Sequence, residues 1–333
     1  MSRAAYDLII IGGGPAGITA GIYAARKKIN TLLITKDFFG QIGSTSRVDN
    51  WPGEMGVGGI ALMEKLEKHL RQFAVEIKTN EKVISVTRPH SSALPRTFSV
   101  QEVARQLPFG SCSATSFCVR TENDIKYVGK ALIVATGRTA RKLGIKGEEE
   151  FLGRGLSYCA VCDGPFFKDK QVVVVGAGNA GFETALDLAK YAKKVFIFEK
   201  SGNIRADELL QSEVRNNTKI EILLQTDLQK VEGRGKVQSI TYKDLTEQKI
   251  FQQPMDGVFS QIGGSPVTDF LGSQLKLNKN REIIVNHLTM ETSQKGVFAA
   301  GDCNDTKFKQ MIIAAGQGAV AALSVYEYLQ SPT

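Results

Sequence analysis

The chain has 333 residues, 42% of them hydrophobic, which is enough to build a sizeable core and favours two domains over one. Lys and Arg exceed Asp and Glu by eight, but the basic residues are dispersed rather than gathered into the runs or aromatic patches of nucleic-acid binders, so we expect no nucleic-acid partner. No apolar stretch approaches the roughly 20 residues of a membrane span, so we expect no membrane partner.

The first predicted unit is a strand, a glycine-rich turn, a helix and a second strand. Residues 7–11 form an apolar strand that runs directly into the turn 12–17, without the cleavage site of a signal peptide. Residues 18–27 have helical periodicity, and residues 30–35 form the next strand. In such a turn the first glycine permits the tight bend, the second lets backbone N–H groups approach a pyrophosphate, and the third lets the helix pack closely on the strand. The predicted cofactor contacts here are Gly12, Gly14, Pro15, Ala16 and Gly17.

The same pattern recurs later in the chain. Residues 171–175 form a strand, 176–181 the turn GAGNAG, 182–191 a helix and 194–199 a second strand. One glycine pattern alone is weak evidence, because many strands join helices through glycine turns. Two copies, each with its strands and helix, predict an α/β fold with two Rossmann-like dinucleotide-binding domains. The predicted contacts in the second turn are Gly176, Gly178, Asn179 and Gly181.

Two further loops of small residues follow apolar strands, one at 130–134 and the other at 296–300. Small residues leave room for a flavin, and Asp302 can accept hydrogen bonds from a ribityl hydroxyl. Residues 309–311 then open an Ala- and Gly-rich helix whose N-terminus would stabilise the anionic edge of a reduced flavin. The predicted contacts in the two loops are Ala135, Thr136, Gly137, Gly301 and Asp302.

One pair of cysteines, Cys159 and Cys162, has CxxC spacing. Five cysteines in a chain of this length do not make a secreted disulfide framework, so we expect a cytoplasmic protein, in which a CxxC suggests redox chemistry. The two sulfurs can bridge within one turn, and a helix N-terminus can lower a thiol pKa. A zinc site would need a second CxxC or clustered histidines, and the chain has three His, so we expect no metal. We expect no role for Cys112, Cys118 or Cys303.

Six motifs follow one another in an order that resembles the low-molecular-weight thioredoxin reductases. They are GGGPAG at 12–17, DNWPG at 49–53, ATG at 135–137, CAVCDG at 159–164, GAGNAG at 176–181 and AAGD at 299–302. The resemblance covers most of the chain and implies an FAD-dependent disulfide oxidoreductase that forms a homodimer. It also implies that FAD contacts Gln41, Asn50 and Gln310.

The resemblance further implies that the second nucleotide domain is inserted into the first. We expect residues 1–147 and 257–333 to form the FAD domain, and residues 148–256 to form the inserted domain that binds NAD(P) or another ADP-containing cofactor and carries the CxxC. A nicotinamide and the disulfide of one domain cannot both lie against the flavin, so similar enzymes rotate one domain against the other. Hinges are expected near 146–149 and 255–257.

By the same resemblance, Cys162 faces the flavin and accepts its electrons. Cys159 then becomes the outward thiolate, which attacks a partner disulfide through a mixed disulfide. Asp163 matches the family's proton donor and acceptor. The chain begins its FAD fold at Tyr6, without the N-terminal thioredoxin-like domain of alkyl hydroperoxide reductase flavoproteins, so a separate thioredoxin-like protein is the expected substrate.

Two segments depart from the family pattern. The first is a polar stretch at 89–115, which we expect to be a surface insertion. The second follows the strand 194–199, where NADPH-specific members carry His-Arg-Arg and a later Arg. The aligned residues here are Glu199, Lys200, Ser201 and Arg205. A carboxylate at this strand end prefers a free ribose 2′-hydroxyl and repels a 2′-phosphate, so we expect NADH in preference to NADPH.

Three functions remain open. The leading one is an NADH-linked reductase of a thioredoxin-like protein. The second is a thioredoxin-reductase-like enzyme that is fed by ferredoxin or holds a second FAD, because the turn and Glu199 recognise only an ADP ribose, which FAD also has. Thr184, which replaces a residue that is often Glu in the family, also favours the second. The third is a flavin-binding redox sensor without turnover, against which Asp163 counts.

Overall fold

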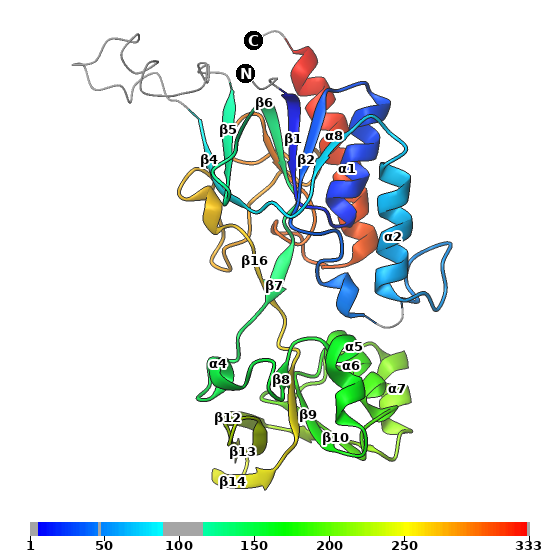
Figure 1. Cartoon of the computed structure of the whole chain (residues 1–333), viewed down its shortest axis with the longest axis vertical. Coiled ribbons are helices and arrows are strands. Elements are labelled where there is room, and N and C mark those ends of the chain that lie inside the picture. Colours follow the sequence, from blue (N-terminus) through cyan, green and yellow to red (C-terminus); the bar gives the residue numbers. More distant parts are fainter. Residues whose placement is uncertain (1–5, 46–47, 89–115, 332–333) are drawn as a thin grey trace, which may run out of the picture.

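The computed structural model describes residues 6–45, 48–88 and 116–331, which form two lobes joined by two crossings of the chain (Figure 1). The predicted surface insertion at 89–115 lies outside the described residues, and so does Cys112. Each lobe contains one of the two predicted nucleotide folds. The predicted fold class, two Rossmann-like domains with the second inserted into the first, is confirmed.

The first lobe is built on a sheet of order β3-β2-β1-β6-β5-β4, with β17 pairing the end of β6. Its strands are β1 (Tyr6–Ile11), β2 (Thr31–Ile34), β3 (Glu76–Lys78), β4 (Val83–Thr87), β5 (Phe117–Thr121), β6 (Lys126–Val134) and β17 (Val297–Ala299). Strands β3, β2, β1, β6 and β17 run parallel, whereas β4 and β5 join the start of β6 in an antiparallel meander. Side chains of β1 alternate between the two faces, so Leu8 and Ile10 pack under the helices while Ile9 and Ile11 pack on the opposite face.

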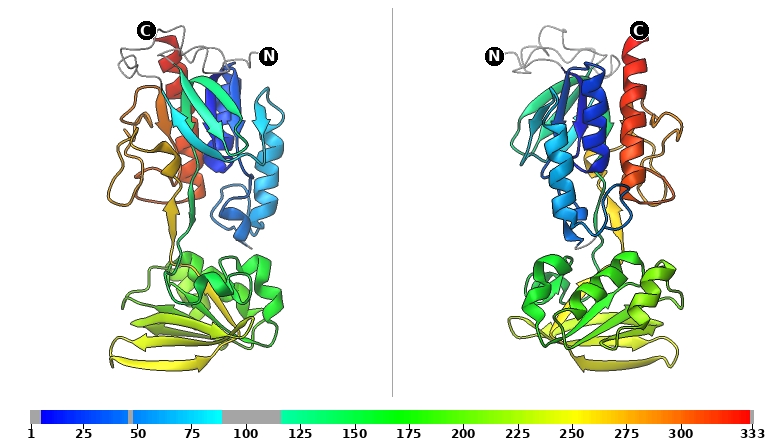
Figure 2. Two further views of the ribbon diagram at one scale, coloured as in Figure 1. Left: turned by 60° about the vertical axis from the view of Figure 1, so that its left-hand side comes forward. Right: turned by 90° about the vertical axis from the view of Figure 1, so that its right-hand side faces the viewer.

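Three helices cover one face of this sheet: α1 (Pro15–Arg26), α2 (Gly59–Leu70) and α8 (Met311–Gln330) (Figure 2). Helix α8 has 20 residues, and an 18-residue window within it has a mean hydropathy of 1.3. By length and composition it could cross a membrane, which corrects the sequence interpretation that no apolar stretch is this long. The helix packs directly on α1, because a Cβ on Gly318 would lie 2.1 Å from the carbonyl oxygen of Ala16. Two short turns, η1 (Ile42–Ser44) and η3 (Asp269–Leu271), complete the lobe.

The second lobe contains a parallel sheet of order β11-β10-β9-β15-β8. Helices α5 and α6 lie on the side that faces the first lobe, and an antiparallel meander of order β12-β13-β14 lies on the far side (Figures 1 and 2). The strands are β8 (Leu156–Ser157), β9 (Gln171–Val175), β10 (Lys194–Glu199), β11 (Ile220–Leu224), β12 (Thr226–Gly233), β13 (Val237–Asp244), β14 (Lys249–Pro254) and β15 (Gly257–Ser260). The helical segments are α4 (Glu148–Phe151), α5 (Ala160–Asp163), η2 (Gly164–Phe167), α6 (Asn179–Ala189) and α7 (Glu208–Arg215).

The chain crosses between the lobes at β7 (Arg138–Ala140) and β16 (Gly264–Pro266), which pair with each other. The inserted lobe is therefore longer at both ends than the predicted 148–256, and the predicted hinges lie inside it. The reason is that β15 is a central strand of the inserted sheet, between β9 and β8, and not the return to the FAD domain. Its first residue is fixed there by packing, since a Cβ on Gly257 would lie 2.3 Å from the Phe167 ring.

Candidate active site and nucleotide sites

The first glycine turn joins β1 to α1 and leaves an open space at its middle glycine. Gly12 has a φ of +117°, and a Cβ there would lie 2.3 Å from the carbonyl oxygen of Ala135. A Cβ on Gly17 would lie 1.9 Å from the carbonyl oxygen of Gly12, so the helix rests on the strand end. A Cβ on Gly14 would meet nothing within 4 Å. The turn therefore presents bare backbone at the N-terminus of α1, which suits a pyrophosphate.

The other predicted flavin contacts lie around this turn. Ala135 follows β6, and its N–H donates to the carbonyl oxygen of Ile11 at 2.8 Å. Gly301 follows β17, which pairs the same end of β6, and its N–H donates to Gln317 at 2.8 Å. Because β1, β6 and β17 are parallel, their carboxyl ends bring the small residues of all three loops to one edge of the sheet. The residues present fit a flavin dinucleotide.

Two predicted flavin contacts come from distant segments and meet. The side-chain amide of Asn50 donates to Gln310 at 3.1 Å, and Gln310 is the residue that precedes α8. Gln41 lies elsewhere, beside the crossing strand β16, where its amide nitrogen would be 3.0 Å from a Cβ on Gly264. The structure thus brings Asn50 and Gln310 together and places Gln41 at the junction of the lobes.

Beside the flavin loops lies a group of buried and half-buried charges that the sequence interpretation missed. Arg138 and Lys309 both contact Glu282, at 3.1 and 3.0 Å, and the three side chains are 15%, 22% and 10% exposed respectively. Burial opposes the charge of Glu282, but hydrogen bonds from Asn278 and Lys309 outweigh it and lower the pKa of this carboxyl. No local pattern links these residues. Burial raises the pKa of Asp302, the predicted ribityl contact, in the same region.

The CxxC cysteines form a disulfide, with their Cα atoms 5.4 Å apart. Cys159 precedes α5, and its Sγ accepts a hydrogen bond from the Cys162 N–H at 3.2 Å. Helix α5 lies against η1 of the first lobe, so the pair sits where the lobes meet. Cys162 is exposed, whereas Cys159 and Asp163 are half-buried. In this arrangement of the lobes the more exposed cysteine is the one assigned to the flavin, and the assignment of the two roles stays a prediction.

The other described cysteines have different environments. Cys118 is disulfide-bonded. Cys303 is a free, fully buried thiol whose Sγ contacts the carbonyl oxygen of Val134 at 3.3 Å. Burial raises the pKa of this thiol to about 11, which keeps it protonated and unreactive near neutral pH.

The second glycine turn joins β9 to α6 in the inserted lobe. Gly176 has a φ of +113°, and a Cβ there would lie 2.4 Å from the carbonyl oxygen of Gln261. A Cβ on Gly178 would meet nothing within 4 Å. The predicted contact Asn179 is engaged with Asp207, donating to its carboxylate at 2.6 Å and accepting from its N–H at 2.8 Å. The turn again presents open backbone at a helix N-terminus, and Asn179 fixes the start of α7 against it.

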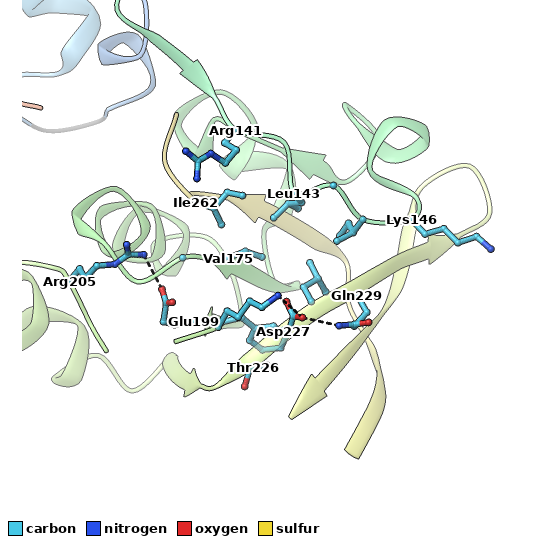
Figure 3. A pocket seen from close by; sticks show the side chains of 16 residues that line it. Arg141, Leu143, Lys146, Val175, Glu199, Arg205, Thr226, Asp227, Gln229 and Ile262 are labelled. Carbon is cyan, nitrogen blue, oxygen red and sulfur yellow. Dashed lines mark hydrogen bonds and ion pairs between the residues drawn. The ribbon is translucent and has the colours of Figure 1, made fainter. Parts of the chain in front are cut away.

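A cavity of about 530 Å³ opens beside this turn (Figure 3), and four predicted nucleotide contacts line it: Gly176, Glu199, Lys200 and Arg205. The buried carboxylate of Glu199 accepts hydrogen bonds from the Ala177 N–H at 3.0 Å and the Ser201 N–H at 2.9 Å. Arg205 lies 3.7 Å from it. Burial opposes the charge, but the hydrogen bonds outweigh it and lower the pKa of Glu199. The carboxylate is therefore ionised and held at the end of β10.

The sequence interpretation missed the second carboxylate of this cavity, Asp227. It accepts from Lys200 at 3.0 Å and from Gln229 at 2.9 Å, so Lys200 is neutralised across the cavity. Asp227 lies on β12, far along the chain from the glycine turn and outside every motif. Its position in the cavity could therefore not be inferred from the residues that follow the second strand.

Glu183 on α6 has a pKa raised to about 7 by burial and by the nearby carboxylates of Asp187, Asp207 and Asp49. Asp49 belongs to the first lobe, so the N-terminal half of α6 lies close to the first lobe in this arrangement. This half-buried carboxyl therefore gains or loses its proton near neutral pH.

Comparisons with known proteins agree with this geometry. Residues 6–318 match the model of the pyridine nucleotide-disulphide oxidoreductase family. The chain is 35% identical over 98% of its length to a Pseudomonas aeruginosa protein named as a subunit of alkyl hydroperoxide reductase, and 33% identical over 97% to a Ferdinandcohnia aciditolerans protein named NADH dehydrogenase. It spans only 59% and 57% of the lengths of these two relatives. Thioredoxin reductase of Lactococcus lactis in its FR conformation matches with a TM-score of 0.87 and 32% identity, over 97% of this chain and 99% of that one.

The chain belongs to the pyridine nucleotide-disulphide oxidoreductase family, and the family implies FAD and a nicotinamide as cofactors. Within it, the chain is a thioredoxin-reductase-like flavin disulfide oxidoreductase with Cys159 and Cys162 as its cysteine pair. The family predicted from the six motifs is thereby confirmed.

Proposed function

We propose that the chain passes electrons from NADH, in preference to NADPH, through FAD and the Cys159–Cys162 disulfide to a disulfide of a separate thioredoxin-like or peroxiredoxin-type protein. The observation that carries the preference is the ionised Glu199 carboxylate at the end of β10. The names of relatives support the proposal in outline, since one is called NADH dehydrogenase and others are named as parts of alkyl hydroperoxide reductase.

Glu199 is oriented to receive a ribose. Its Oε2 accepts from the turn at Ala177 and its Oε1 from Ser201, so the backbone fixes the plane of the carboxylate. The Ser201 hydroxyl also donates to Oε1, so the acceptor capacity that remains for a 2′- or 3′-hydroxyl is on Oε2. A 2′-phosphate placed there would bring two further negative charges against a buried carboxylate, and the repulsion is strong away from bulk water.

The cysteine pair receives two electrons and two protons when its disulfide opens, and FAD supplies the two-electron chemistry that links it to the nicotinamide. The Cys162 N–H, 3.2 Å from the Cys159 Sγ, stabilises a thiolate on Cys159. Asp163 follows directly and would hold a proton for the pair. The Cys159 thiolate then attacks the partner disulfide, and Cys162 resolves the mixed disulfide, which restores the bond and leaves the partner as a dithiol.

The first test is anaerobic mixing of the FAD-loaded protein with NADH or NADPH while the absorbance of the oxidised flavin is followed. The proposal predicts rapid bleaching with NADH and much slower bleaching with NADPH. Equal bleaching by both would remove the preference. No bleaching by either nucleotide would overturn the proposal that a nicotinamide is the electron donor. A flavin-to-chain ratio of two would then identify a second FAD. A ratio of one, with bleaching by reduced ferredoxin, would identify ferredoxin as the donor.

The second test addresses the protein substrate. In Cys162→Ser the thiolate of Cys159 lacks its resolving partner, so a thioredoxin-like disulfide should be trapped as a stable mixed disulfide that reductant releases. Cys159→Ser is the matched control and should trap nothing. Trapping by Cys159→Ser alone would reverse the roles of the two cysteines, and trapping by neither would overturn a disulfide substrate.

A further inference from the structure

The basic residue that follows Glu199 is bound by a carboxylate of its own lobe. Lys200 occupies a position where NADPH-specific members of the family carry an arginine, so from the sequence alone it is a candidate partner for a 2′-phosphate. Its ammonium nitrogen lies 3.0 Å from Asp227, and its side chain is 70% exposed while that of Asp227 is 21% exposed. The lysine therefore reaches over the cavity to a carboxylate held in the cavity wall.

Asp227 is fixed from a second direction. The amide of Gln229, the next residue but one along β12, donates to the same Asp227 oxygen at 2.9 Å (Figure 3). The cavity is lined by two carboxylates, Glu199 and Asp227, and both have partners that orient them. Three other cations line it: Arg205 lies near Glu199, the Lys146 side chain points away from both carboxylates, and Arg141 lies on the opposite side of the cavity from Asp227 (Figure 3).

We propose that Asp227 is a specificity-determining residue of the nucleotide site, which excludes a 2′-phosphorylated adenosine by neutralising Lys200 and by adding its own negative charge to that of Glu199. This inference rests on the proposed use of NADH and deepens it. A phosphate entering the cavity would have to break the Lys200–Asp227 pair to gain the lysine, and Asp227 would then be left unpaired beside it. A free 2′-hydroxyl can bind without breaking the Lys200–Asp227 pair.

The test is binding of two probes to the oxidised, FAD-loaded protein by titration calorimetry: AMP, and adenosine 2′,5′-bisphosphate, which differs by the 2′-phosphate. The measured quantity is the ratio of their dissociation constants, because a general loosening of the cavity would weaken both. In Asp227→Asn, which keeps the size of the side chain, the ratio should move toward the bisphosphate by about tenfold or more. Glu247→Gln is the matched control, since it removes one negative charge from an exposed turn of the same lobe.

A double-mutant cycle shows whether the gain comes from the freed lysine. Lys200→Met alone should not move the ratio toward the bisphosphate, because the lysine is already paired and its removal leaves the Asp227 charge in place. The double variant Asp227→Asn with Lys200→Met should lose the part of the gain that the freed lysine supplies and keep only the part that comes from removing the Asp227 charge. An unchanged ratio in Asp227→Asn, with a wild type that prefers AMP, would overturn the role of Asp227 while leaving the NADH preference intact. A wild type that binds neither probe, or prefers the bisphosphate, would overturn the NADH site itself and this inference with it.

Discussion

The two nucleotide folds of the chain have nearly the same glycine turns. Gly12 and Gly176 have φ values of +117° and +113°, and a Cβ on either would lie 2.3 or 2.4 Å from a carbonyl oxygen of the next loop. At Gly14 and Gly178 the space is open in both. The two lobes therefore have the same backbone arrangement for binding a pyrophosphate, and the turn alone does not select the nucleotide.

The folds differ where their second strands end. In the first lobe β2 is followed by Thr35, whose hydroxyl donates to the carbonyl oxygen of Asp37 within its own loop. In the second lobe β10 ends in Glu199, whose carboxylate accepts from the glycine turn at Ala177. The glycine turn is thus common to the two folds, and the folds differ in the charge at the end of the second strand, on which the proposed choice of nucleotide depends.

Placing a side chain in one glycine turn at a time should destabilise the protein more than any other change considered. Gly12→Ala and Gly176→Ala each force a Cβ against a carbonyl oxygen at a left-handed φ, and each should cost about 3 kcal/mol of unfolding free energy, measured by denaturant titration. Gly12→Ala should also lose bound FAD. Gly176→Ala should keep the flavin absorbance but lose its bleaching by NADH.

Gly14→Ala and Gly178→Ala are the matched controls, since their Cβ atoms meet nothing within 4 Å. They should unfold like the wild type when no cofactor is bound. If Gly176→Ala lost FAD as readily as Gly12→Ala, the two folds would not be independent sites.

These turns can be predicted because their signals are local. The strands predicted at 171–175 and 194–199 are β9 and β10 to the residue, since an apolar run against a glycine turn has few alternatives. The lobe boundary cannot be predicted in the same way, because the buried run at β15 fits either sheet until the pairing with β9 is known. The place of Asp227 in the cavity cannot be predicted from the sequence for a related reason, since its partner Lys200 is on another element.

A second effect on stability is expected where the chain enters the inserted lobe, because hydrogen bonds to Glu148 hold that segment. The Glu148 carboxylate accepts from the N–H groups of Leu143 and Gly144 at 2.6 and 2.7 Å, and from the Tyr158 hydroxyl at 2.5 Å. Glu148→Ala leaves these donors unpaired and should cost about 2 to 3 kcal/mol, measured by denaturant titration. Tyr158→Phe removes only one donor and should cost about 1 kcal/mol. Equal losses in the two variants would contradict this account.

The pH dependence of this stabilisation follows from the direction in which the pKa of Glu148 is shifted. Burial opposes the charge of Glu148, yet the three hydrogen bonds lower its pKa below the usual carboxyl value. A group whose pKa is lower in the folded state stabilises above its unfolded pKa and loses that contribution as pH falls through the folded pKa. The difference between wild type and Glu148→Ala should therefore be full at pH 7 and shrink below about pH 4.

Helices α1 and α6 differ at their fifth residue. This difference predicts a smaller effect on stability, with a pH dependence opposite to that of Glu148. The fifth residue of α1 is Thr19, and that of α6 is Glu183, whose pKa is raised to about 7 by burial and by three carboxylates. Such a group destabilises the fold once it ionises, so stability falls as pH rises from about 4.5 to about 7. Glu183→Gln should be more stable than the wild type by about 1 to 2 kcal/mol at pH 8 and equal to it at pH 4.5. Thermal unfolding at the two pH values measures the difference, and an advantage independent of pH would contradict it.

The smallest expected effect is on discrimination rather than stability. Glu199→Gln keeps an acceptor for the Ala177 N–H but removes the charge that the first fold lacks at the matching strand end. The ratio of the flavin-bleaching rate constants with NADH and NADPH should then fall by about tenfold, or about 1.4 kcal/mol, because only the phosphate repulsion is lost. Thr35→Val is the control in the other fold and should leave the ratio unchanged. If Glu199→Gln lowered both rate constants equally, the carboxylate would hold the ribose without selecting it, and discrimination would fall to Asp227 and Lys200 alone.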